Sequence, residues 1–173
     1  MKTVWTFTNK KELDKNQFID YFERKVFRTI RKHQLLPKNK IFTLKKSQDI
    51  NTAVLKQILE TKFQVKLLPS REGTYRSATK PNTSTTNLSS EAENIFKKII
   101  KGNFGHKTKP SPLLNLSDKE IELYAKLKNI KGTKRKENKK IQNLFKKFLT
   151  KNQDLEVNIL NAQNQIIPQN YLS

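Results

Sequence analysis

The side chains of this sequence that are best suited to chemistry are cations, and the chemistry that they suit is the binding of phosphate. Lysine and arginine number 36 against 15 aspartate and glutamate residues, which gives a formal charge of +21. Ammonium groups attract phosphate as point charges, and guanidinium groups hold it through paired hydrogen bonds. A surplus of this size indicates a polyanionic partner, and nucleic acid is the first hypothesis.

The cations gather in two main places. Between Lys15 and His33, apolar residues recur every four positions, which predicts an amphipathic helix with a basic outer face. A second basic run follows Ile130, and a loop places Tyr75 where its ring could stack on a base. Plain solvent exposure is the alternative explanation for each group. The predicted RNA-binding residues are Arg24, Lys25, Arg28, Arg31, Lys32, Arg71, Tyr75, Arg76, Lys131, Lys134, Arg135, Lys136, Lys139 and Lys140.

Other kinds of chemistry lack the residues that they need. The sequence contains no cysteine and two histidines, His33 and His106. It offers no disulfide, no thiolate ligand for zinc or an iron–sulfur cluster, and no cysteine nucleophile. Two histidines also leave little for a metal site or a catalytic triad, so we predict no metal and no cofactor. The helix dipole would favour the charged form of His33 at a helix C-terminus.

Local patterns predict strands that alternate with helices. The predicted strands are 3–8, 41–44, 65–68 and 155–159, and the predicted helices are 15–33, 52–62, 87–102, 117–130 and a last one from 141. Ser117 and Glu120 have the spacing of a capping box. Residues 70–86 predict a flexible loop, and residues 161–173 a loose tail. This order predicts an α/β fold with a short, mostly parallel sheet and flanking helices.

Three blocks of the sequence, in the same order, resemble the tRNA thiouridine synthases of the PP-loop ATP pyrophosphatase superfamily. Residues 17–37 resemble the helix before that family's nucleotide-binding loop. Residues 85–94, Thr-Thr-Asn-Leu-Ser-Ser-Glu-Ala-Glu-Asn, resemble its G-H-N-L-D-D-E-A-Q-T, and residues 109–127 resemble its K-P-L-R-x-I-P-E-K-E-V-x-L-Y-A. The resemblance implies a tRNA partner and a single, reduced three-layer PP-loop domain over residues 15–160, with a strand remnant at 1–14.

The sequence departs from this family where the family binds nucleotide. The family's S-G-G-K-D-S loop is replaced by Ser47, Gln48, Asp49, Ile50, Asn51 and Thr52, which lack the glycine amides and the lysine. In the second block, Ser89 and Ser90 follow Asn87 where the family carries acidic residues. The resemblance then implies a vestigial nucleotide loop, a vestigial second motif and a protein without catalytic activity. Helix capping by Asn51 is the alternative explanation for the polar loop residues.

These observations predict a shortened, non-catalytic relative of the tRNA thiolation enzymes that binds tRNA or another structured RNA through its backbone. Two alternatives stay open at this point. The chain could be an rRNA-binding component of a ribonucleoprotein particle, including the ribosome, or a minimal ATP-binding subunit that works with an active thiolation subunit. No apolar run approaches the ~20 residues of a membrane span, and the N-terminus lacks a signal-peptide core, so we expect a cytoplasmic protein without a membrane partner.

Overall fold

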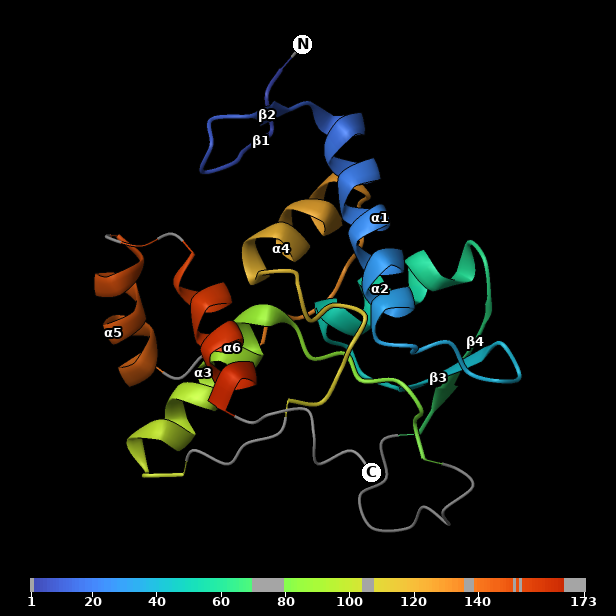
Figure 1. Cartoon of the computed structure of the whole chain (residues 1–173). Coiled ribbons are helices and arrows are strands. Elements are labelled where there is room, and N and C mark those ends of the chain that lie inside the picture. The colour runs from blue at the N-terminus through green and yellow to red at the C-terminus, as the bar shows by residue number, and fades with distance from the viewer. Residues whose placement is uncertain are drawn as a thin grey trace. The chain divides into compact units, whose positions relative to one another are not determined.

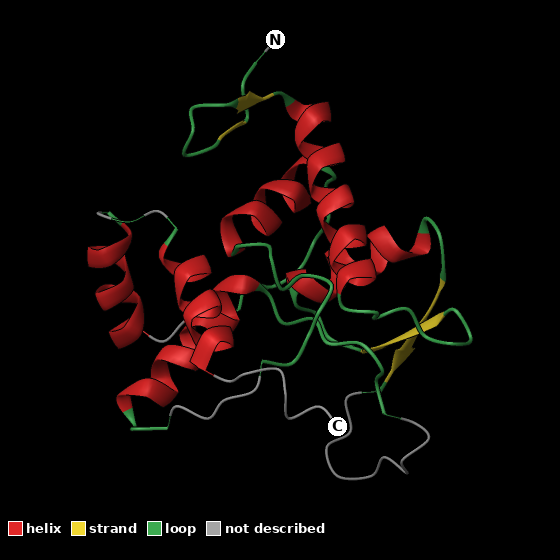
Figure 2. Ribbon diagram, viewed as in Figure 1, coloured by secondary structure: helices red, strands yellow, loops and turns green. Residues whose placement is uncertain are grey.

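The computed structural model describes residues 2–69, 80–103, 108–135, 139–150, 152 and 154–166 (Figure 1). Helices make up most of this part of the chain, and the strands are short (Figure 2). The chain divides into two compact units. The first comprises Met1–Asn87 with Pro110–Arg135, and the second comprises Leu88–Lys109 with Lys136–Ser173.

The first unit begins with a small antiparallel hairpin. Its strands are β1, Trp5–Thr6, and β2, Glu12–Leu13. The strand expected over residues 3–8 is therefore shorter than predicted, because the chain already turns at Lys10, whose φ is +63°. The Trp5 ring lies 5.5 Å from the ring of Phe18, so an aromatic contact holds the hairpin against the helix that follows.

The predicted first helix is confirmed as α1, Lys15–Lys32. Its start is a capping box: the Asp14 carboxylate accepts hydrogen bonds from the amides of Asn16 and Gln17, and the Gln17 side chain accepts one from the Asp14 amide. The four-residue apolar repeat packs into the core as predicted. The buried residues of this helix are Phe18, Phe22, Val26, Thr29 and Ile30.

His33 is the C-cap of α1. Burial, and then the charge of Lys32, lower the pKa of His33 below its ordinary value. The structure therefore favours the neutral imidazole at this position, whereas the helix dipole alone predicts the charged form.

The predicted order of strand, helix and strand is confirmed, and the two strands form a small parallel sheet. Strand β3, Ile41–Lys45, pairs in parallel with β4, Gln64–Leu68, in a register that joins Ile41 to Gln64. Helix α2, Ile50–Glu60, connects them. The predicted α/β class and the short parallel sheet are confirmed, and the three-layer arrangement stays a prediction.

Part of the predicted flexible loop is fixed on the sheet. The Asn82 side chain accepts a hydrogen bond from the Thr43 amide at 2.8 Å and donates one to the Ile41 carbonyl at 3.0 Å. The Thr83 amide donates to the Thr43 carbonyl. Asn82 and Thr83 are thus attached to β3, although the polar and non-periodic sequence of this segment predicts a flexible loop. Residues 70–79 lie outside the described residues.

The core of the first unit is completed by α4, Asp118–Leu127. The predicted capping box is confirmed, since Ser117 accepts from the Glu120 amide while the Glu120 side chain accepts from the Ser117 amide. Leu116 and Ile121, which flank the box, are fully buried. Tyr124 stacks on Phe22 with 4.3 Å between ring centroids, which joins α4 to α1.

The second unit contains the helices α3, Leu88–Ile100, α5, Lys139–Leu149, and α6, Leu155–Ile166, of which α3 and α6 pack together. The strand expected over 155–159 is wrong, and residues 161–166 of the expected tail are helical. Leu155 and Ile159 both pack against the cluster of Ala92 and Ile141, and Gln163 is buried. This four-residue spacing is helical, and the contact with α3 selects it over the alternation that suggested a strand.

Membrane-spanning helices and metal-binding clusters are both absent from the described residues. None of their helices combines the length and the apolar character needed to cross a bilayer. No group of three or more acidic or histidine side chains among them could hold a metal ion.

Candidate nucleic-acid interface

A row of exposed cations runs along the outer side of α1. Arg24, Arg28 and Arg31 are spaced four and three residues apart, so helix geometry places them on one face. Lys32 is also exposed at the end of the helix. Arg24 is paired with Asp20 at 2.8 Å, but both side chains are more than half exposed, so this contact holds the arginine only weakly. We call Arg24, Arg28, Arg31 and Lys32 the basic stripe.

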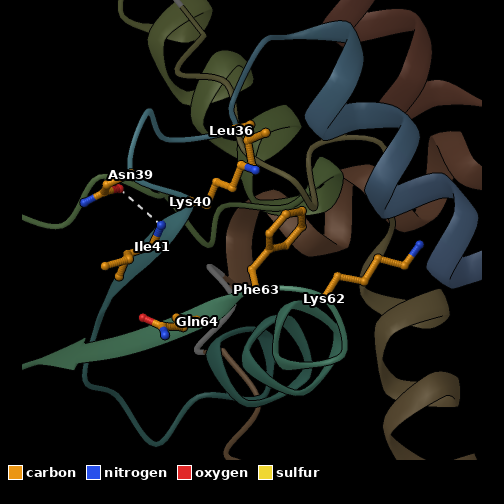
Figure 3. A pocket seen from close by; sticks show the side chains of 7 residues that line it. All are labelled: Leu36, Asn39, Lys40, Ile41, Lys62, Phe63 and Gln64. Atoms are coloured by element: carbon orange, nitrogen blue, oxygen red, sulfur yellow. Dashed lines mark hydrogen bonds between the residues drawn. The ribbon is translucent and has the colours of Figure 1, made fainter.

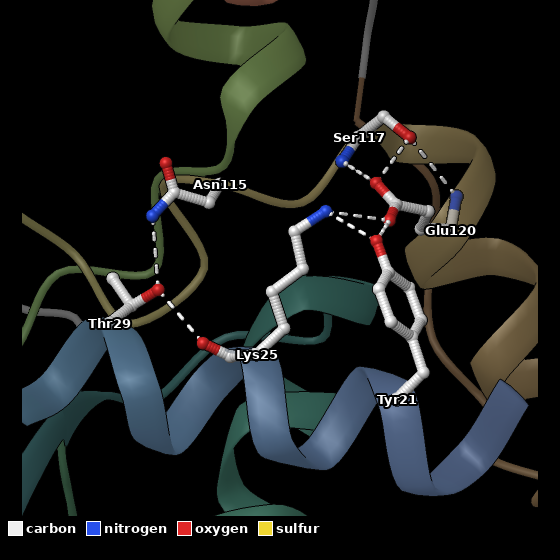
Figure 4. A network of polar contacts seen from close by, with 6 residues as sticks. All are labelled: Tyr21, Lys25, Thr29, Asn115, Ser117 and Glu120. Carbon is white, nitrogen blue, oxygen red and sulfur yellow. Dashed lines mark hydrogen bonds and ion pairs between the residues drawn. The ribbon is translucent and has the colours of Figure 1, made fainter. Parts of the chain in front are cut away.

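Lys25 was predicted as part of this surface, but it lies on a different side of α1. Its ammonium group forms an ion pair with Glu120 at 3.0 Å and a hydrogen bond with the Tyr21 hydroxyl at 2.6 Å (Figure 4). Its side chain is 27% exposed. Lys25 therefore joins α1 to α4 and contributes less to the outer charge than the basic stripe does.

Glu120 is the centre of the polar network between these two helices (Figure 4). Its carboxylate accepts hydrogen bonds from the Tyr21 hydroxyl at 2.8 Å and from the Ser117 amide and hydroxyl at 2.8 and 2.9 Å. The Glu120 side chain is 7% exposed. Burial, followed by the charge of Glu120, raises the pKa of the Tyr21 hydroxyl above its ordinary value. Tyr21 thus stays a hydrogen-bond donor to this carboxylate.

The basic run after Ile130 is divided between the two units. Lys131 is exposed, Lys134 is paired with Glu122, and Arg135 donates to Asp118 at 2.8 Å. Lys139 and Lys140 begin α5, which belongs to the second unit. The remaining predicted contacts, Arg71, Tyr75, Arg76 and Lys136, lie outside the described residues.

The loop that stands in the nucleotide-binding position, Ser47–Thr52, leads into α2. Asp49 is the N-cap of this helix, and its carboxylate accepts from the Thr52 amide and the Thr52 hydroxyl, both at 2.8 Å. The expectation that Asn51 caps the helix is wrong. Asn51 lies within the first turn and donates to the Thr85 carbonyl instead, because Asp49 has the position from which a side chain reaches the free amides.

The segment around Thr133 also contacts the start of α2. The Thr133 carbonyl accepts from the Ile50 amide at 3.0 Å, and the Thr133 amide donates to the Gln48 carbonyl at 2.8 Å. Gly132 allows this approach, since a Cβ there would come within 2.7 Å of the Ile50 Cα. The amides of Ile50 and Thr52, which a phosphate would use at a helix start, therefore already have partners inside the protein.

This arrangement predicts a stabilising role for Asp49. We expect Asp49→Ala to lower the free energy of unfolding by about 1 kcal/mol, because the Thr52 amide loses its partner. Asp49→Asn, which retains a good cap, should cost only a fraction of that. Chemical denaturation of the two variants and the unaltered protein measures both effects, and an Asp49→Ala protein of unchanged stability would refute the capping role.

The second predicted motif is divided between the units. Asn87 is fully buried and donates from its side chain to Asp118, which also holds Arg135. Ser89 belongs to the second unit, where its hydroxyl donates to Glu156 at 3.0 Å. Ser90 lies in the first turn of α3. The sequence pattern predicted a capping box at the start of α4. It did not predict that Asp118 binds Arg135 or that Glu120 binds Lys25.

A surface groove of about 530 Å³ lies between the loop that joins α1 to β3 and the turn that joins α2 to β4. Sequence patterns did not indicate this groove. Leu36, Lys40, Lys62 and Phe63 contribute to its lining (Figure 3). The lysines stand next to an apolar side chain and an aromatic one, a combination that suits an anionic ligand with a flat ring. The distance between them along the chain hides this combination, because Lys40 precedes a predicted strand whereas Lys62 ends a predicted helix.

The fold is similar to that of a solved tRNA-modifying enzyme. Among solved structures, the chain is similar to the U34-tRNA thiolase NcsA from Methanococcus maripaludis, determined with its [4Fe-4S] cluster. The TM-score is 0.72 at 12% sequence identity, and the match covers 95% of this chain and 84% of that chain. No protein-family model and no curated protein matches the sequence. The resemblance to tRNA thiolation enzymes is thus confirmed at the level of the fold.

The comparison also corrects one prediction. We expected a protein without catalytic activity, but the structure that shares the fold is that of a thiolase, so the fold points to enzymes and that prediction is wrong. An iron–sulfur cluster like that of NcsA does not fit the side chains of this chain, because such clusters are held by cysteine thiolates and the 173 residues contain none.

Proposed function

We propose that this protein acts on tRNA and binds it along the phosphate backbone through the basic stripe of α1. The observation that carries the proposal is the exposure of Arg24, Arg28 and Arg31 on one face of a helix whose opposite face is fully buried. A rigid helix holds these cations in a fixed row of about 10 Å, which suits a regular array of phosphates.

The charge and the fold support the same proposal. The formal charge of +21 provides the long-range attraction that non-specific contacts with a nucleic acid require. The shared fold with a U34-tRNA thiolase favours tRNA over ribosomal RNA as the partner. Lys131 and Lys134 are further exposed cations of the same unit.

A salt titration tests this function. If six to eight phosphates are neutralised, the affinity for unmodified tRNA should fall by roughly three decades between 50 and 200 mM salt, because each contact releases condensed counterions. Fluorescence anisotropy with labelled tRNA measures the dissociation constant at each salt concentration. An affinity that stays constant over this range, or no binding at the lowest salt, would exclude the proposal.

A further inference from the structure

The groove between the α1–β3 loop and the α2–β4 turn contains the Phe63 ring, whose two neighbouring rings are tilted against it and not stacked in parallel. Phe63 packs near Phe42 and Phe27 with centroid distances of 5.2 and 6.4 Å, and the ring planes are tilted by 58° and 56°. Phe63 is partly exposed, and Leu36 beside it is 45% exposed. The groove thus offers an apolar floor with access for a flat ring.

Two lysines, Lys40 and Lys62, flank this apolar floor. Figure 3 shows the Phe63 ring between the side chains of Lys40 and Lys62, both of which are exposed. The Lys62 ammonium lies 4.3 Å from the centroid of the Phe27 ring, which fixes the lysine at the edge of α1. Among the residues found to line the groove, none is acidic, and Gln64 adds an amide group. The surroundings therefore favour an anion that carries a ring.

The groove lies beside the basic stripe. Phe27, which contacts both Lys62 and Phe63, is three residues from Arg24 and four from Arg31. Residues at these spacings are neighbours on a helix surface. A nucleic-acid strand that follows the stripe would therefore pass the mouth of the groove.

We propose that this groove receives an unpaired nucleobase of an RNA whose backbone lies on the basic stripe. The base stacks on Phe63 against Leu36, and Lys40 and Lys62 contact the phosphates on either side of it. This inference rests on the proposed function, and it adds a preference that the stripe alone does not provide. Backbone contacts recognise paired and unpaired RNA alike, whereas stacking in a groove requires a base that has left the helix.

The test compares two RNAs with the same paired stem. One is a stem–loop with 2-aminopurine among its unpaired loop bases, and the other is a blunt duplex. The unaltered protein should bind the stem–loop about tenfold more tightly than the duplex, and binding should quench the 2-aminopurine fluorescence through stacking. Phe63→Leu should remove both the tenfold preference and the quenching while its affinity for the duplex stays unchanged.

A second variant protects the test against misfolding. Leu36→Glu places a negative charge in the groove at an exposed position, so it should weaken binding of the stem–loop without loss of fold, as thermal melting checks. Equal affinity of the unaltered protein for both RNAs, or a preference that survives both substitutions, would overturn the groove proposal and leave the backbone proposal standing. Failure to bind either RNA would instead refute the proposed function.

Discussion

Replacement of Arg24, Arg28 and Arg31 by glutamine is expected to weaken tRNA binding by roughly two decades at 0.1 M salt. Each contact between a cation and a phosphate releases about 0.8 of a counterion, which is worth about 0.8 of a decade at this salt relative to 1 M. The slope of log affinity against log salt should also become shallower by about two. Anisotropy titrations of the variant at several salt concentrations measure both quantities.

Glutamine suits this experiment because it changes charge and little else. Its helix propensity is close to that of arginine, and the ion pair that Arg24 makes with Asp20 is exposed, so its loss costs a few tenths of a kcal/mol. The control is a triple variant in which Lys10, Lys11 and Lys15 are changed to glutamine. It loses the same charge, and these lysines are exposed outside the basic stripe. Equal losses of affinity in the two triple variants would argue for diffuse attraction and against an interface on α1.

Glu120→Ala is expected to destabilise the protein by about 3 kcal/mol and to lower its melting temperature by roughly 10 °C. The substitution leaves Lys25 and the Tyr21 hydroxyl without their buried partner, and it removes the side-chain half of the α4 capping box. The loss of a buried charge partner costs much more than the net value of the pair, because the remaining charge stays poorly hydrated. Differential scanning calorimetry measures the change.

Two other variants separate the causes of this effect. Glu120→Gln keeps one acceptor oxygen for the Ser117 amide but replaces the oxygen that faces Lys25 and Tyr21 with an NH2 group, so it should cost about 2 kcal/mol, less than Glu120→Ala. Glu122→Ala removes a carboxylate of the same helix whose partner, Lys134, is 68% exposed, and it should be nearly neutral. A Glu120→Ala protein no less stable than Glu122→Ala would contradict the central role of Glu120.

Sequence periodicity was sufficient for most of the helices. The four-residue repeat of Phe18, Phe22, Val26 and Ile30 predicted α1 and its buried face, and the spacing of Ser117 and Glu120 predicted the start of α4. These signals are local, because helix hydrogen bonds and caps join residues a few positions apart. The same reasoning failed for residues 155–166, where contact with α3 selected a helix.

The sequence predicted the positive charge of the candidate site, but not which cations are exposed or which residues meet in the groove. Five cations of α1 were equivalent in the sequence, and the structure divides them into an exposed basic stripe and Lys25, which pairs with a carboxylate 95 positions away. The groove brings together Leu36 and Phe63, and no local pattern relates them. The side chain that caps α2 is Asp49, whereas the sequence pattern suggested Asn51 as one explanation of the polar loop.

The amino-acid sequence by itself determined the excess of positive charge, the absence of thiol chemistry, the positions of the main helices and the order of elements that resembles the tRNA thiolation enzymes. Composition and short-range periodicity are sufficient for these properties. Only the tertiary structure decided which cations face solvent, which are paired with acids, and where a partly exposed ring meets two lysines. Such contacts depend on distances between residues far apart in the chain, and those distances are defined only when the helices pack.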